Sequence, residues 1–138
     1  CKIKERKQKK LFLGNLNAKR DWGHAKDYCD AMWRILQQKK PDDYVIATGV
    51  QYSIKEFVNL TAKKLKIKLK WRGKGIKEKA IDENGNTIIE CDKNYFRPLD
   101  VNTLLGDAQK ARRKLKWIPT ENINSLIDEM IKSEYQNF

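Results

Sequence analysis

Residues 11–28 read LFLGNLNAKRDWGHAKDY, and the order of patterns within them predicts the fold. A short apolar run at 11–13 stops at Gly14-Asn15, which predicts a buried strand followed by a turn. From Ala25 onward, apolar residues recur at steps of three and four, as on one face of a helix that ends before Pro41. A strand, a turn and an amphipathic helix in this order are typical of an α/β fold.

Arg20 and Asp21 lie on the turn that we expect to open this helix, and a phosphate site is one interpretation of them. Backbone N–H groups at a helix N-terminus lack partners, so a guanidinium beside them is well placed to hold an anion. Arginine also forks two hydrogen bonds onto a phosphate, which suits this role better than lysine. The alternative is a surface arginine paired with Asp21 or Asp27. We expect Asp21 and Trp22 to be structural, and His24 to pack without a catalytic role.

The rest of the chain continues the alternation of strands and helices. Further strands are predicted at 44–49, at 68–71 and in a hairpin that joins 80–81 to 87–89 through Asn84-Gly85. Residues 2–10 are predicted as the end of a longer helix, and two further helices are predicted after the Ser53–Glu56 capping box and at about 107–116. A last helix is predicted from near residue 122, with Leu126, Ile127, Met130 and Ile131 facing inward. Trp33 and Trp117 are expected in the core. For Trp71, core packing and stacking on a nucleic-acid base both stay open as interpretations. These patterns together predict the α/β class.

Composition fits one soluble, cytoplasmic domain of 138 residues without a transmembrane helix, a secretory signal or a membrane partner. The three cysteines lack paired ligand spacing and His24 is the single histidine, so we expect no metal site. The net charge of +12 has two interpretations: solvated lysine faces with a local phosphate site, or a nucleic-acid surface at Lys63–Lys79. No nucleic-acid-binding motif accompanies the lysines, so we expect no nucleic-acid partner.

Several motifs, in their order and spacing, resemble those of GDP-mannose 4,6-dehydratases, which are extended short-chain dehydrogenase/reductase enzymes acting on nucleotide sugars. The motifs are Leu13–Leu16, Arg20–His24, Asp43–Gly49, Tyr95–Val101, Leu105–Asp107 and Lys114–Trp117. The resemblance runs from about Lys9 to the last helix and covers only the C-terminal part of such an enzyme. It implies part of an extended Rossmann-type fold, mostly the smaller substrate-binding lobe, with residues 1–138 as a single partial domain.

The same resemblance implies a nucleotide site. Arg20 and Arg97 would contact the diphosphate of GDP-mannose, and Asp100 would accept hydrogen bonds from the ribose hydroxyls. Gly14 and Asn15 could add a polar contact near the nucleotide, or serve only the turn. At Arg97 and Asp100 the alternative is a loop ion pair, which is worth little at a surface. Asp100 stands where the dehydratases usually have glutamate, so a related GDP-sugar epimerase or reductase stays open as an alternative.

The residues that transfer hydride in this family are absent from the sequence. No glycine-rich dinucleotide fingerprint follows a strand, and none of the five tyrosines has a lysine four positions further on. We therefore expect no catalytic or cofactor-binding residue here, with NADP bound by an N-terminal part that would precede Cys1.

The resemblance implies that the parent enzyme is a homo-oligomer, either a dimer or a tetramer. It also implies that this enzyme oxidises the sugar at C4 and removes water across C5–C6, giving GDP-4-dehydro-6-deoxy-mannose. A third hypothesis, made without the family, is a free-standing basic module that binds polyanions.

Overall fold

The computed structural model describes residues 1–97, 101 and 103–136. Its strands are β1 Leu11–Leu13, β2 Lys19–Asp21, β3 Gln51–Ser53, β4 Lys70–Arg72, β5 Lys79–Ile81 and β6 Thr87–Cys91. Its helices are α1 Ala25–Leu36, α2 Ile54–Lys64, α3 Gln109–Lys114 and α4 Ile123–Gln136, with single 3₁₀ turns at Gly75–Lys77 and Lys93–Tyr95. The predicted α/β class is confirmed.

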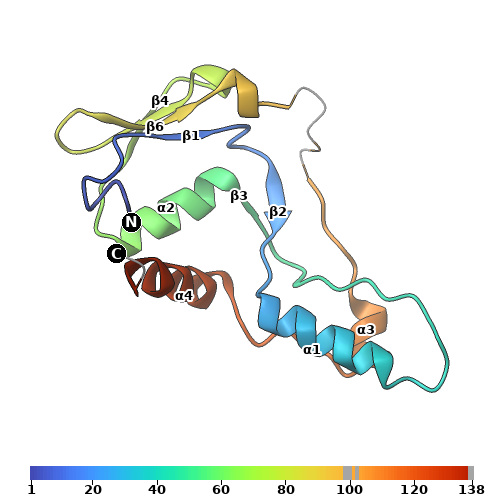
Figure 1. Ribbon diagram of the computed structural model, residues 1–138. Helices are drawn as coiled ribbons and strands as arrows, with labels where there is room; N and C mark the ends of the chain where they lie inside the picture. Colours follow the sequence, from blue (N-terminus) through green and yellow to red (C-terminus); the bar gives the residue numbers. More distant parts are fainter. Residues whose placement is uncertain (98–100, 102, 137–138) are drawn as a thin grey trace.

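The elements are arranged in two parts joined by a ribbon (Figure 1). One part contains a four-stranded sheet of order β1-β6-β5-β4, with α2 and α4 beside it. In this sheet β1 runs parallel to β6, and the other pairs are antiparallel. The other part contains α1 and α3. The antiparallel ribbon of β2 and β3 lies between the two parts, so residues on it are close to both.

Two local sequence signals are confirmed in detail. The Asn84-Gly85 hairpin joins β5 to β6, with Gly85 at a φ of 85° and the Asp82 carboxylate accepting backbone N–H groups from Asn84 at 3.0 Å and Asn86 at 2.8 Å. The capping box opens α2: Ser53 Oγ accepts the Glu56 N–H at 3.1 Å, and the Glu56 carboxylate accepts the Ser53 N–H at 2.6 Å.

Each part has its own hydrophobic core. Under the sheet, the buried residues Ala80, Ile88 and Ile89 pack with Val58 of α2. In the other part, Ala31 of α1 packs with a buried set from α3 and the segment after it, namely Ala108, Ala111, Leu115 and Trp117. Trp117 is fully buried, as expected, and its Nε1 donates to the Asp27 carbonyl at 2.8 Å.

Near the N-terminus, two expectations are wrong. Residues 2–10 form turns rather than a helix, and Arg6 has a φ of 56°. Most helical stability comes from packing an apolar face, and this lysine-rich tract has none. Residues 11–13 do form a strand, but it is not buried: β1 lies at the edge of the sheet, and Leu11 and Phe12 are exposed.

Three further corrections concern apolar residues. Residues 44–49 do not form a strand, because no strand in the described part of the chain pairs with them. Trp33 is exposed rather than in the core, since α1 packs against its core through Ala31. Met130 of α4 is also exposed. Over the described residues, no helix is both long and apolar enough to span a membrane.

Candidate functional site

Arg20 lies on the ribbon rather than at a helix entrance. Residues 19–21 form β2, in which Arg20 is opposite Tyr52 of β3. The helix α1 begins only at Ala25, after His24 as its N-cap. The predicted turn at Arg20 is therefore wrong, and the N–H groups at the start of α1 do not account for a phosphate site at this residue.

The side chain of Arg20 instead joins the ribbon to the segment that carries the second predicted arginine. Its Nη1 donates to the Lys19 carbonyl and to the Val101 carbonyl, both at 2.7 Å. Val101 follows the predicted residues Arg97 and Asp100, of which Asp100 lies outside the described residues. Arg97 itself is exposed. The structure therefore places the Arg20 guanidinium against the backbone of Val101, four positions after Arg97 in the sequence.

Gly14 lies against the backbone that precedes Arg97. A Cβ added at Gly14 would overlap the carbonyl of Tyr95, two residues before Arg97, so only glycine allows this close approach. Asn15 has a turn role, since its Oδ1 accepts the Asn17 N–H at 3.0 Å. Four of the five predicted site residues are described, and Gly14 and Arg20 flank the stretch that contains Arg97.

Asp21 and Trp22 hold the ribbon in place. The Asp21 carboxylate accepts the Thr48 N–H at 3.1 Å, the Thr48 hydroxyl at 2.8 Å and the Gly49 N–H at 2.8 Å. Trp22 donates to the Tyr52 carbonyl at 3.0 Å, and its ring centroid lies 4.5 Å from that of Phe57. Both residues are structural, as expected, and they fix the backbone on each side of the ribbon next to Arg20.

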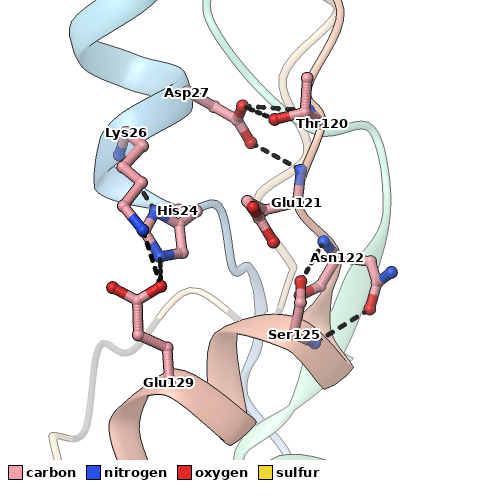
Figure 2. Close-up of polar contacts among 8 residues, drawn as sticks. All are labelled: His24, Lys26, Asp27, Thr120, Glu121, Asn122, Ser125 and Glu129. Atoms are coloured by element: carbon pink, nitrogen blue, oxygen red, sulfur yellow. Dashed lines mark hydrogen bonds and ion pairs between the residues drawn. The ribbon is translucent and has the colours of Figure 1, made fainter. Parts of the chain in front are cut away.

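Just after the ribbon, His24 and Asp27 tie α1 to the chain around α4 (Figure 2). His24 Nδ1 accepts the Lys26 N–H at 3.0 Å, and Nε2 lies 3.1 Å from Glu129 Oε2, which also accepts from Lys26 Nζ at 2.9 Å. Because Nδ1 accepts, the proton of a neutral ring is on Nε2, which donates to Glu129. His24 is buried and fully engaged, so it is a packing residue, as expected.

The buried Asp27 carboxylate is the second tie in this cluster. It accepts the Thr120 N–H at 3.0 Å, the Thr120 hydroxyl at 2.7 Å and the Glu121 N–H at 3.0 Å (Figure 2). Burial alone would raise the pKa of Asp27, but these hydrogen bonds to the ionised form outweigh it and lower the pKa. No sequence spacing indicates these partners, because they lie more than 90 residues from Asp27.

The chemistry available at the predicted site is anion binding. Arg20 supplies a guanidinium whose position is set by the ribbon, and Arg97 supplies a second on the neighbouring segment. An apolar cavity of about 470 Å³ lies elsewhere, lined by residues such as Leu13, Phe57 and Ile127, and its lining does not suit a diphosphate. Within the described ranges no cluster of histidine, cysteine and carboxylate side chains could hold a metal ion.

Solved structures with the same arrangement show the class of fold. The structure of RMD from Pseudomonas aeruginosa complexed with NADPH matches with a TM-score of 0.69 at 18% identity, covering 91% of this chain and 36% of that one. UDP-glucuronic acid 4-epimerase from Bacillus cereus matches with a TM-score of 0.71 at 17% identity, covering 99% and 38%. The fold is thus part of the Rossmann-type fold of nucleotide-sugar epimerases and dehydratases. Within it, the chain belongs to the GDP-mannose 4,6 dehydratase family, whose model matches residues 1–130.

Curated relatives agree with this assignment. A GDP-mannose 4,6-dehydratase of Vibrio cholerae serotype O1 is 45% identical over 94% of this chain, and GDP-mannose 4,6 dehydratase 2 of Caenorhabditis elegans is 47% identical over 97%. The match covers 38% of the first and 35% of the second. The chain therefore spans little more than a third of the length of these relatives.

Proposed function

We propose that the chain supplies the GDP-sugar-binding lobe of a GDP-mannose 4,6-dehydratase. In this proposal Arg20 and Arg97 bind the diphosphate, and Asp100 accepts hydrogen bonds from the ribose hydroxyls. The observation that carries it is the bond from Arg20 to the Val101 carbonyl, which brings the ribbon to the segment of Arg97. Family membership supplies the identity of the ligand.

The contribution of such a lobe is binding and orientation. Hydrogen bonds to a charged group contribute about 1.5–3 kcal/mol each, so two guanidinium groups on one diphosphate would dominate the affinity. Holding the nucleotide fixed presents the sugar to the reacting groups in one orientation, which lowers the entropy that the reaction must lose. Asp21 and Trp22 support this role because they fix β2.

NADP does not fit this chain. The sequence has no glycine-rich turn between a strand and a helix to hold a dinucleotide, and no tyrosine four residues before a lysine. We therefore assign the binding of NADP and the reaction steps to a portion of the enzyme outside these residues.

Calorimetric titration with GDP tests the proposal. Arg20→Ala and Arg97→Ala should each weaken GDP binding by about tenfold or more, since each removes a charge-assisted bond. Arg113→Ala is the matched control, because it removes an exposed arginine from α3 and should leave the affinity unchanged. An equal loss in all three variants would indicate general electrostatic attraction and would contradict the clamp. GMP should bind much more weakly than GDP.

Asp100 favours a second candidate function, that of a related GDP-sugar epimerase or reductase. Its carboxylate reaches less far than the glutamate usual in the dehydratases. Product analysis with the complete enzyme distinguishes the two: formation of a 4-dehydro-6-deoxy sugar from GDP-mannose supports the dehydratase. Formation of an epimer of the GDP-sugar, or reduction of an added GDP-4-dehydro sugar, supports the alternative.

A further inference from the structure

Arg112 of α3 holds the loop that leads into β3. Its Nη2 donates to the Thr48 carbonyl at 2.9 Å, across 64 positions of the sequence. Gly49 allows this approach, because a Cβ at Gly49 would lie only 3.2 Å from Arg112 Nη2. Gly49 also has a φ of 85°, which favours glycine. A charged donor makes a stronger hydrogen bond than a neutral one, so the contact restrains the backbone at Thr48 although Arg112 is exposed.

The core fixes the backbone next to both partners of this bond. Ala111, which precedes Arg112, is fully buried, and Ala47, which precedes Thr48, is 5% exposed. Both alanines belong to the hydrophobic cluster of Leu115. Since the backbone on each side is already ordered by this packing, the bond mainly costs the entropy of the arginine side chain. The contact therefore ties the loop to a rigid part of the molecule.

From Thr48 the hydrogen bonds continue to β2. The Asp21 carboxylate accepts the Thr48 N–H at 3.1 Å and the Thr48 hydroxyl at 2.8 Å, and it also accepts the Gly49 N–H at 2.8 Å. Asp21 follows Arg20 in β2, and Arg20 reaches the Val101 carbonyl. Three bonds to one carboxylate join the loop to the strand, so a displacement at Thr48 shifts the backbone that carries Arg20. A continuous chain of contacts thus runs from α3 to the candidate site.

We propose that Arg112 is a positioning residue of the nucleotide site, which orients Arg20 for the diphosphate. Arg112 acts through the loop and Asp21, and it does not itself touch the nucleotide. The inference rests on the proposed function. Orientation matters because arginine binds a phosphate through two parallel N–H groups, whose geometry must be held closely. The alternative is a role at the helix terminus, since the cations in the last turn of α3 interact favourably with the helix dipole.

GDP titration of matched arginine variants tests the proposal. Arg112→Ala should weaken GDP binding by about threefold to tenfold, less than the loss of Arg20 itself, because the contact is exposed. Arg112→Lys should recover most of the affinity, since an ammonium group also donates to one carbonyl. Arg113→Ala removes the same charge from the same turn of α3, and within the described residues Arg113 makes no bond to the loop, so its affinity should be unchanged. An equal loss in Arg112→Ala and Arg113→Ala, or no rescue by lysine, overturns the proposal.

A double-mutant cycle with Arg20 separates positioning from direct attraction of the nucleotide. If Arg112 acts through Arg20, Arg112→Ala should change the GDP affinity by less than about twofold in an Arg20→Ala background. Additive losses would show that Arg112 attracts GDP independently, which overturns the proposal. A normal GDP affinity of Arg20→Ala alone contradicts the proposed function, whereas a normal affinity of Arg112→Ala alone contradicts only the positioning role.

Amide exchange at Gly49 tests the chain of contacts without any nucleotide. The Gly49 N–H is bonded to Asp21, so its exchange reports whether the loop and the strand stay joined. Arg112→Ala should speed this exchange by about threefold or more. Thr48→Val should do the same, because it keeps the shape of the side chain but loses the hydroxyl bond to Asp21. Thr48→Ser keeps the hydroxyl and is the matched control, with exchange close to that of the wild type. Unchanged exchange in Arg112→Ala, or equally fast exchange in both Thr48 variants, overturns the proposal.

Discussion

At the scale of single residues, Gly14 allows the backbone after β1 to approach the backbone at Tyr95, next to the candidate site. A side chain at this position would overlap the Tyr95 carbonyl, and backbone cannot move away as a flexible side chain would. Gly14→Ala should lower the free energy of unfolding by about 1–3 kcal/mol, the usual cost of overpacking. Thermal unfolding measures the loss, and GDP titration should show weaker binding because the segment of Arg97 is displaced. An unchanged melting temperature would contradict the close approach.

Asp27 gives a prediction about pH. Its folded pKa lies below the ordinary 3.8, because the hydrogen bonds from Thr120 and Glu121 outweigh the effect of burial. A depressed carboxylate pKa contributes stability that is fully present above the unfolded pKa and is lost as the pH falls through the folded pKa. Urea unfolding should therefore show this loss below about pH 4.

The comparison variant for Asp27 is asparagine, which keeps the shape but not the charge. Asp27→Asn should cost about 1–3 kcal/mol at neutral pH, because amide N–H groups of Thr120 and Glu121 lose a charged acceptor. It should also flatten the dependence of stability on pH in the acid range. If the variant retains the full wild-type slope below pH 4, another carboxylate is responsible.

At the scale of the element, the start of α1 depends on an unusual N-cap. His24→Ala removes the acceptor of the Lys26 N–H and the contact with Glu129, and should cost about 0.5–2 kcal/mol. His24→Asn restores a good N-cap without the contact to Glu129, so it should recover part of the loss. Chemical denaturation of the three proteins measures this. An asparagine variant no more stable than the alanine variant would show that the contact with α4, and not the cap, matters.

Elements set by nearby residues were predictable from the sequence. The Ser53–Glu56 box and the Asn84-Gly85 hairpin are complete within a few residues, so their signals suffice. The 44–49 segment was predicted as a strand and is not one, because a strand depends on a partner that local sequence does not reveal. The prediction that Trp33 lies in the core was wrong for a related reason: helical spacing identifies an apolar stripe but not what covers it.

The candidate site was predictable only in part. The family motifs pointed to Arg20 and Arg97, but the turn expected at Arg20 is a strand. The bond from Arg20 to the Val101 carbonyl spans 81 positions, and the ties from Asp27 span more than 90. Such contacts depend on how the two parts of the molecule are joined, and no short-range spacing in the chain encodes that.

At the scale of the whole molecule, two separate cores predict two units of local stability. The sheet part is centred on Ile88 and Ile89, and the other on Leu115 and Trp117. The described links between them include the β2–β3 ribbon and the polar ties between α1 and the chain around α4 (Figure 2). Polar contacts couple the unfolding of two parts less strongly than a shared apolar core does. Each part should therefore unfold locally with its own free energy.

Native-state hydrogen exchange on a matched pair of core variants tests this division. Leu115→Ala should cost about 2–5 kcal/mol and should speed amide exchange in α1 and α3 far more than in β5 and β6. Ile89→Ala removes a buried side chain of similar size and should give the reverse pattern. If either variant speeds exchange equally throughout, the ribbon joins the parts into one cooperative unit. In that case GDP bound at the ribbon would stabilise the whole chain, whereas with two units it would protect mainly the amides next to β2 and β3.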